Sequence, residues 1–181
     1  WRKLGGDING EAFDDESGTS VALSADGTIV AIGAPYNNGY GIDSGHVRVY
    51  QRDVTSTDAP NGWIKLGDDI DGKAAGDQSG WSVALSADGT IVAIGARGND
   101  ANGTNSGHVR VYQYDASKTI SSTNQSSAHF GPKGWRRLGG DIDGEANNDW
   151  SGTSVALSAY GNIVAIGARE KWRVEGEGGE E

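Results

Sequence analysis

The chain consists largely of three copies of one sequence unit, and this internal repetition limits its folds more than any other feature. The segment SVALSADGTIVAIGA at residues 20–34 recurs unchanged at 82–96. It returns at 154–168 with two changes, Tyr160 in place of Asp and Asn162 in place of Thr. Repetition of this kind is typical of architectures that place several copies of one supersecondary unit side by side.

A tryptophan opens each unit and fixes the length of the repeat. Trp1, Trp63 and Trp135 each begin a Trp-x-x-Leu-Gly motif, 62 residues apart in the first interval and 72 in the second. The extra residues lie in the polar segment 115–133. An insertion that the fold tolerates is expected in a surface loop.

Alternating apolar residues predict four short strands in a complete unit. Residues 20–24 and 28–34 alternate with a period of two, and Asp26-Gly27 between them supplies the positive φ angles of a tight hairpin turn. The motif HVRVY, first present at 46–50, is a third alternating strand, and Trp-x-x-Leu-Gly is a fourth. The predicted fold class is therefore all-β, with small residues near a crowded axis and tryptophans on outer strands.

These motifs resemble the FG-GAP repeat of integrin-α β-propellers. The match consists of Ser-Gly-x-Ser-Val-Ala, the Asp-Gly turn, Ile-Val-Ala-Ile-Gly-Ala-Pro ending at Pro35, and Ser-Gly-His-Val-Arg-Val-Tyr. The family's Phe-Gly is Ser-Gly in all three units, and its Gly-Ala-Pro survives only at residues 33–35. The resemblance covers nearly the whole chain. It implies β-propeller blades of the kind that form the ligand-binding heads of adhesion proteins.

The repeats give one β-propeller-like domain, residues 1–181, whose third blade is incomplete. Propellers typically have four to eight blades, so three blades do not close a ring. Either two chains form a homodimer of six blades, each donating its Trp1 strand to the other, or the chain belongs to a longer propeller or a larger complex. The repeats cover about 1–62, 63–134 (with the inserted loop 115–133) and 135–175, where 171–175 offers a poor third strand, and an acidic, glycine-rich tail covers 176–181.

Composition disfavours several classes of function. The 25 acidic residues outnumber the 15 basic ones, and the resulting net charge of −10 repels nucleic acid and anionic membrane surfaces. No apolar stretch approaches the roughly 18 residues that a membrane-spanning helix needs. The chain has no cysteine, so disulfides and thiolate sites are absent. Its 30 glycines against three prolines favour tight turns over disorder.

Oxygen-rich loops are the candidate metal sites. In each unit a pair of oxygen-bearing residues precedes a glycine, and another aspartate follows at a fixed offset. Calcium takes six to eight oxygen ligands, so it is the cofactor that these loops would bind. The alternative is that the aspartates cap turns by accepting backbone hydrogen bonds. The calcium loop that the resemblance implies lies elsewhere, between the first two strands, where this chain has only a short turn. The candidates are Asp7, Asn9, Asp15, Asp69, Asp71, Asp77, Asp141, Asp143 and Asp149.

Aromatic residues outside the repeat pattern are the candidate partner surface. Trp81 and Trp150 have no tryptophan at the equivalent positions, and Tyr36 and Tyr40 lie in the loop 36–43 between predicted strands. The recurring tryptophans are expected in packing between blades instead. Stacking of a sugar ring on the irregular tryptophans is the glycan-binding version of this hypothesis.

Four polar residues complete the set of candidates. Asn102 and Asn124 each begin an Asn-x-Ser/Thr sequon in a predicted loop, which marks them as glycosylation candidates and favours an extracellular location. His46 and His108 occupy equivalent strand positions, too far apart to share one metal ion, and are expected to be packed or surface strand residues.

The sequence favours a non-enzymatic binding, adhesion or assembly module, because repeated residues serve a scaffold while catalytic sites break the symmetry. Its partner is expected to be a protein or a second copy of the chain, outside the cell, with no nucleic acid and no membrane insertion. One alternative is a structural subunit that stabilises a larger complex. A third interpretation is a carbohydrate-active enzyme or lectin on a propeller, which would need an asymmetric pair of carboxylates or a glycan-stacking surface.

Overall fold

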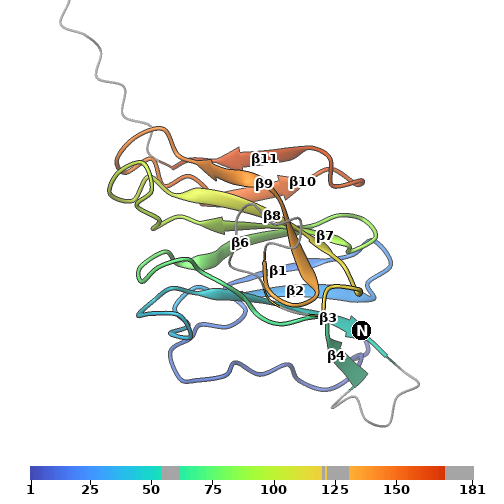
Figure 1. The fold of residues 1–181 in the computed structure, drawn as a ribbon. Coiled ribbons are helices and arrows are strands. Elements are labelled where there is room, and N and C mark those ends of the chain that lie inside the picture. Colours follow the sequence, from blue (N-terminus) through green and yellow to red (C-terminus); the bar gives the residue numbers. More distant parts are fainter. Residues whose placement is uncertain (54–61, 120, 122–130, 170–181) are drawn as a thin grey trace, which may run out of the picture.

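The computed structural model describes residues 1–53, 62–119, 121 and 131–169, and it contains three antiparallel sheets. Sheet 1 has the order β1-β2-β3-β4, and β5 also pairs with β3. Sheet 2 has the order β6-β7-β8-β9, and sheet 3 is the pair β10-β11. Figure 1 shows the three sheets one above another. The strands are β1 Ser20–Leu23, β2 Ile29–Ala34, β3 His46–Arg52, β4 Trp63–Lys65, β5 Ile70–Asp71, β6 Ser79–Leu85, β7 Ile91–Ala96, β8 His108–Tyr114, β9 Trp135–Asp143, β10 Ser154–Leu157 and β11 Val164–Gly167.

The all-β prediction is confirmed, and the strands lie where the alternating patterns placed them. Sheets 1 and 2 are each offset from the sequence unit, because the Trp-x-x-Leu-Gly strand pairs with the HVRVY strand of the unit before it. Trp63 pairs with Arg52, and Trp135 pairs with Tyr114. No helix in the described ranges is long and apolar enough to cross a membrane. The predicted strand at 171–175 lies outside the described residues.

The strand expected at Trp1 is absent from the described structure of a single chain, and its donation to a second copy stays a prediction. Residues 1–11 form no strand, and the Trp1 side chain is fully exposed. The physical reason is the offset of the sheets. The strands at Trp63 and Trp135 each pair with the HVRVY strand of the preceding unit, whereas residues 1–11 pair with no HVRVY strand among the described residues.

The Asp-Gly hairpin turn has one positive φ angle rather than two. Gly27 has φ 70°, whereas Asp26 keeps a negative φ and uses its carboxylate to accept hydrogen bonds from the Ser24 hydroxyl (2.6 Å) and the Thr28 amide (3.0 Å). The hydrogen bond from Ser24, followed by those from Thr28, lowers the pKa of Asp26 to about 2. The carboxylate therefore holds the turn together in its ionised form.

The two changes in the third unit compensate for each other at this turn. Tyr160 replaces the aspartate, so the turn loses the carboxylate that accepts the serine hydroxyl. Asn162 replaces the threonine, and its Oδ1 accepts the Ser158 hydroxyl at 2.8 Å. The serine hydroxyl in turn accepts the Ile163 amide at 3.1 Å, as Ser24 accepts the amide of Ile29. The acceptor has moved two residues along the chain, and the turn is preserved.

Neighbouring sheets approach so closely that only glycine fits at the contact. A Cβ built on Gly33 would lie 2.1 Å from the carbonyl oxygen of Gly80, and one on Gly95 would lie 2.1 Å from that of Gly152. Next to each contact a serine hydroxyl crosses the gap: Ser20 donates to Gly80 O and Ser82 to Gly152 O, both at 2.7 Å. The same contact therefore joins sheet 1 to sheet 2 and sheet 2 to sheet 3.

Buried apolar side chains from sheets 1 and 2 form one hydrophobic core in the described ranges. Trp135 is its largest fully buried side chain; the indole Nε1 donates to Leu66 O at 2.9 Å, and the ring lies edge-on to Tyr114 with centroids 5.3 Å apart. The buried members are Ile29, Ala31, Val47, Val49, Leu66, Ile70, Val83, Val92, Ile94, Tyr112 and Trp135.

Lys118 ties together the two ends of the inserted segment. Its side chain is buried, and the ammonium donates to the carbonyl oxygens of Gly131 and Pro132, the latter at 2.6 Å. Burial lowers the pKa of Lys118. Lys118 thus holds the start of the insertion, after β8, next to its end, before β9.

We expect Trp135→Ala to lower the free energy of unfolding by about 3–5 kcal/mol, because it removes a fully buried indole and leaves a cavity. Trp1→Ala is the matched control, since it changes the same position of the repeat where the side chain is exposed, and should change stability by less than about 0.5 kcal/mol. Urea unfolding followed by circular dichroism measures both. Equal effects of the two substitutions would contradict the packing described here.

Candidate functional site

A histidine faces an aspartate across the outer strands of each complete sheet. The register sets His46 of β3 opposite Asp71 of β5, and His108 of β8 opposite Asp143 of β9. Both imidazoles are buried. The Nδ1 of His108 lies 3.8 Å from Oδ1 of Asp143, and neither of these buried atoms has a hydrogen-bond partner among the described residues. Burial, with a further contribution from the charge of Arg110, lowers the pKa of His108 to about 3, so this imidazole is neutral near pH 7.

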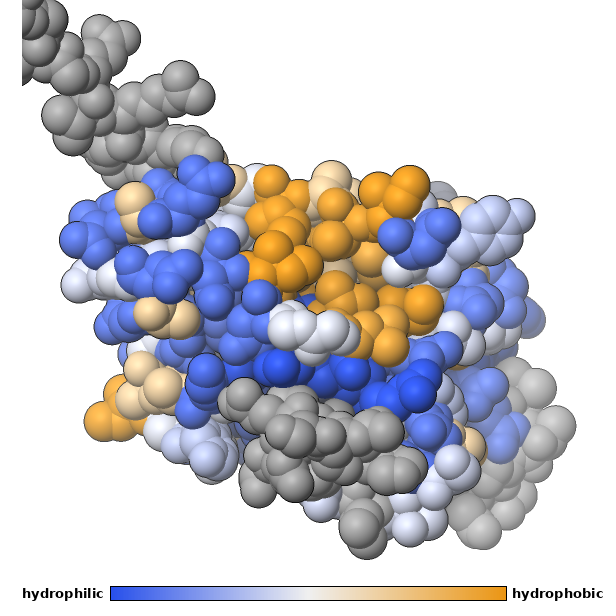
Figure 2. Space-filling view, turned by 45° about the horizontal axis from the view of Figure 1, so that its top comes forward, coloured by the Kyte–Doolittle hydropathy of each residue, from blue (hydrophilic) through white to orange (hydrophobic). Residues whose placement is uncertain are grey.

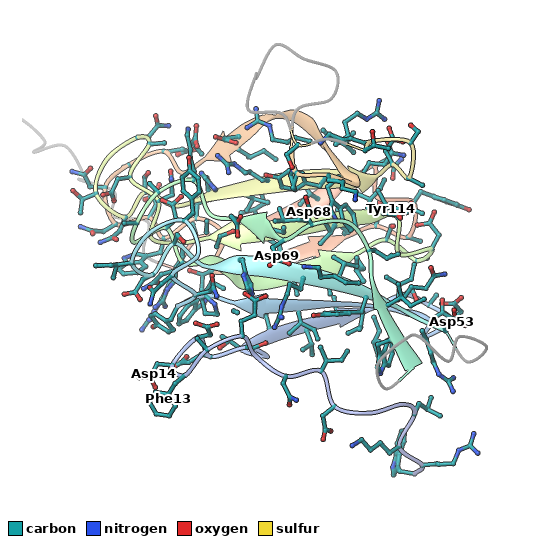
Figure 3. The ribbon with its side chains drawn as sticks, turned by 60° about the horizontal axis from the view of Figure 1, so that its bottom comes forward. Phe13, Asp14, Asp53, Asp68, Asp69 and Tyr114 are labelled. Carbon is teal, nitrogen blue, oxygen red and sulfur yellow. The ribbon has the colours of Figure 1, made fainter. Side chains whose placement is uncertain are left out.

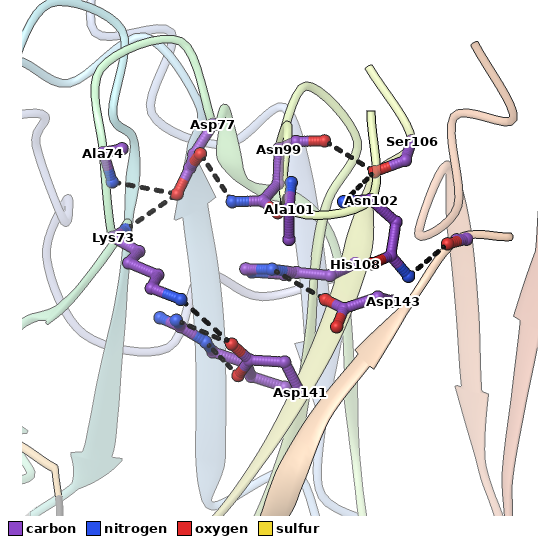
Figure 4. A network of polar contacts seen from close by, with 12 residues as sticks. Lys73, Ala74, Asp77, Asn99, Ala101, Asn102, Ser106, His108, Asp141 and Asp143 are labelled. Carbon is purple, nitrogen blue, oxygen red and sulfur yellow. Dashed lines mark hydrogen bonds and ion pairs between the residues drawn. The ribbon is translucent and has the colours of Figure 1, made fainter. Parts of the chain in front are cut away.

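Next to His108, three basic side chains surround the carboxylate of Asp141 (Figure 4). Arg110 binds it through two nitrogens at 2.7 and 3.2 Å, and Arg137 Nη1 and Lys73 Nζ approach at 2.7 and 3.6 Å. Burial alone would raise the pKa of Asp141, but the hydrogen bonds and charge of Arg110 hold it at about 2. Asp141 is therefore an anion whose charge is already compensated.

The equivalent place in sheet 1 has the opposite charge balance. Glu11 occupies the position that Lys73 occupies in the next unit, and its carboxylate lies 3.4 Å from Arg48 Nη1 and 4.0 Å from His46 Nδ1. Lys65 Nζ binds Asp69 at 2.7 Å. Burial, followed by the charges of Asp69 and Glu11, raises the pKa of Asp71. One carboxylate thus replaces one ammonium, and the field around His46 is more negative than that around His108.

Two groups of residues in the described part of the chain bring metal-ligand atoms within 4.8 Å of one another. The first is Glu11, His46 and Asp69; the second is His108, Asp141 and Asp143. The three basic side chains on Asp141 oppose a divalent cation in the second group, so the first group has the better charge balance for one.

The aspartates at 15, 77 and 149 are buried and accept hydrogen bonds from the turn that precedes them. Asp77 Oδ2 accepts the amides of Lys73 and Ala74, both at 2.9 Å, and Oδ1 accepts the side-chain amide of Asn99 at 2.8 Å (Figure 4). Asp149 accepts both corresponding amides, from Glu145 and Ala146, and Asp15 accepts that of Ala12. This geometry fits the turn-capping alternative, since the donors already occupy the oxygens that calcium would need.

The three predicted calcium loops do not each form their own cluster of metal-ligand atoms among the described residues. Asp69 lies in the first metal-ligand group and Asp141 and Asp143 in the second, while the capping aspartates belong to neither. In the first unit Asp7 is exposed and binds Lys3 Nζ at 2.7 Å, and the backbone carbonyl of Asn9 accepts a hydrogen bond from Arg48 at 2.9 Å.

A second cluster contains aromatic residues from all three units. The Arg97 guanidinium lies over the Trp81 ring, 3.0 Å from its centroid, and 5.0 Å from that of Trp150. Tyr36 meets Trp81 edge-on with centroids 6.4 Å apart. Arg97 Nε donates to Gln78 Oε1 at 2.8 Å. The arginine is held between rings of neighbouring units, and each of these side chains is partly exposed.

The remaining predicted site residues lie elsewhere. Tyr40 is exposed in its loop, and no ring contact joins it to the aromatic cluster. The side chain of Asn102 is at the surface, and its Nδ2 donates to Gly144 O at 3.1 Å. Asn124 lies outside the described residues. In Figure 3, Phe13 and Asp14 project outward from the segment that precedes β1. Asp69 lies over the strands in the same view.

The sequence did not lead us to predict the arginines beside the two histidines, nor the arginine among the aromatic rings. Arg48 and Arg110 stand two residues after the histidines, and that spacing places both side chains on one face of a strand. Arg97 occupies the position of Pro35 in the first unit and of Arg169 in the third, so the change from proline was the available signal at this position.

The structure is all-β with antiparallel sheets, and its FG-GAP repeat suggests a β-propeller-type module, a class often found in adhesion and binding proteins. The model of the FG-GAP repeat family matches residues 70–112, from β5 to β8, which confirms that this segment is an FG-GAP-like repeat. A comparison with curated proteins finds no match to the chain.

We expect Asp77→Ala to lower the free energy of unfolding by about 2–4 kcal/mol, because two backbone amides and the Asn99 amide lose a buried acceptor. Asp14→Asn serves as the control: it removes a carboxylate that is exposed, at a positive φ that asparagine tolerates, and should have little effect. Chemical denaturation of both variants checks this. A small loss for Asp77→Ala would mean that the capping contacts contribute little.

Stability should decrease as the pH falls below about 6.5, where free histidine titrates. The pKa of His108 in the folded chain is about 3, so between these values the unfolded state binds a proton that the folded state does not. One such imidazole contributes a slope of up to about 1.4 kcal/mol per pH unit. Denaturant titrations between pH 7 and about 4 should show a smaller slope for His108→Gln. An unchanged slope would show that His108 is not the group responsible.

Proposed function

We propose that the chain is a non-enzymatic module that binds a protein partner through its aromatic cluster, defined as Tyr36, Trp81, Arg97 and Trp150. The observation that carries this proposal is the convergence of side chains that break the repeat. Positions that are identical in every unit serve the sheets and turns. Positions that differ, and nevertheless meet in space, are those that a scaffold uses for recognition.

The chemistry of the cluster supports a protein partner. Tryptophan, tyrosine and arginine are the residue types that contribute most to protein interfaces, since they bury a large area at low conformational cost. Arg97 is held by Trp81 and by Gln78, so little side-chain entropy would be lost on binding. FG-GAP repeats occur in extracellular proteins such as integrins, which supports a location outside the cell and a binding role.

The test is binding of the purified chain to a panel of cell-surface and matrix proteins, with a glycan array in parallel. For any protein that binds, we expect Trp81→Ala to weaken the affinity about tenfold or more. Tyr40→Ala is the matched control, because it removes an exposed aromatic residue outside the cluster and should leave the affinity unchanged. Binding to glycans alone, or protein binding that Trp81→Ala does not weaken, would argue against the proposal.

A further inference from the structure

Identical sequence segments are buried inside the stack of sheets and exposed at its two ends. In β6, Val83 is 9% exposed and Leu85 packs against the core, because both side chains face sheet 1. Their equivalents in β1, Val21 and Leu23, are 63% and 62% exposed. We call the side of sheet 1 that bears Val21 and Leu23, turned away from sheet 2, the leading face.

The opposite end exposes the other half of the same contact. Ile29 is 9% exposed, but its equivalent in sheet 3, Ile163, is 66% exposed. Ala31 is fully buried, whereas Ala165 is exposed. We call the side of β10 and β11 turned away from sheet 2 the trailing face. Figure 2, with this end turned forward, shows hydrophobic side chains gathered on it.

The polar contacts between sheets have equivalent donors and acceptors at the two ends, and no partner for these is found in the described ranges. The amide of Ala25 donates to Ala87 O, and that of Ala87 donates to Ala159 O, both at 2.8 Å. The next donor in this series is the Ala159 amide on the trailing face, and the acceptor equivalent to Ala87 O is Ala25 O on the leading face. Likewise, Ser154 is equivalent to the donors Ser20 and Ser82, and Gly18 to the acceptors Gly80 and Gly152.

The shape of the leading face fits the apolar groups of the trailing face. Ile29 packs on Gly89 and Ile91 packs on Gly161, so closely that an added Cβ would lie 2.7 and 2.6 Å from the isoleucine side chains. At Gly27, the equivalent glycine of the first unit, nothing lies within 4 Å of an added Cβ. The place that Ile163 of another copy would fill is therefore open.

We propose that the leading face of one copy of this chain binds the trailing face of another, repeating between molecules the contact that joins the sheets within one molecule. This inference goes beyond the proposed ligand binding, since the two faces and the aromatic cluster use different residues. The contact is heterologous: each copy contributes one face of each kind. Two copies joined in this way carry six blades.

The net charge of −10 on each copy opposes association, while the buried apolar area favours it. Salt screens the repulsion between like-charged copies. Association should therefore become stronger as the ionic strength rises, which is the opposite of what a contact based on ion pairs would show.

The test uses two substitutions that each destroy one face, Leu23→Asp on the leading face and Ile163→Asp on the trailing face. Both side chains are mostly exposed, so the fold should persist, and far-UV circular dichroism verifies this. Ile42→Asp is the matched control, because Ile42 is an exposed isoleucine away from both faces, 75% accessible in the loop between β2 and β3. Sedimentation velocity over a range of concentrations measures the size of each species.

We expect the wild type and Ile42→Asp to form species of two or more chains, and each single-face variant to be monomeric. An equimolar mixture of Leu23→Asp and Ile163→Asp should form a one-to-one dimer, since one intact leading face and one intact trailing face remain. A wild type that stays monomeric overturns the proposal. So does a single-face variant that still associates alone, or a mixture that does not, because either result excludes a head-to-tail contact.

Discussion

The structure depends on the close contact between neighbouring sheets at a glycine. At Gly33 and Gly95 the backbone of one sheet lies so near a carbonyl of the next that a side chain would displace it. The adjacent serine hydroxyl satisfies that carbonyl, so the contact is both tight and free of an unpaired acceptor. At the same separation Ile29 packs directly on Gly89 and Ile91 on Gly161.

Much of the fold was predictable from the sequence because the repeat and the strand period report backbone geometry directly. The strands and the turns follow from alternation and from Asp-Gly. The partner of each outer strand was harder to predict, since a motif that recurs in every unit pairs equally well, on paper, with the strand before or after it. The Trp1 segment illustrates that ambiguity: its motif is the same as at Trp63 and Trp135, but only these two pair with an HVRVY strand among the described residues.

The candidate sites were less predictable, because they depend on register and on charge rather than on local pattern. A sequence shows that His108 and Asp143 exist, but only the pairing of β8 with β9 sets them opposite each other. In the same way, the difference between Glu11 and Lys73 is one letter in the repeat, and it reverses the charge beside the buried histidine. The capping aspartates illustrate the limit of composition: an oxygen-rich loop is a ligand set only when backbone amides have not already bound its oxygens.

The offset between the sequence unit and the sheet has a consequence for how such a chain can change in length. Sheet 1 takes β1, β2 and β3 from the first unit and β4 and β5 from the second. Sheet 2 repeats this arrangement, and the pairing of Ile32 with Arg48 recurs as that of Ile94 with Arg110. Deleting one full period from any starting point would join equivalent positions. The hybrid sheet that results would still contain every strand in its proper register. A gene encoding this architecture can therefore gain or lose a blade through recombination at almost any point of the repeat, without requiring the break to fall between sheets.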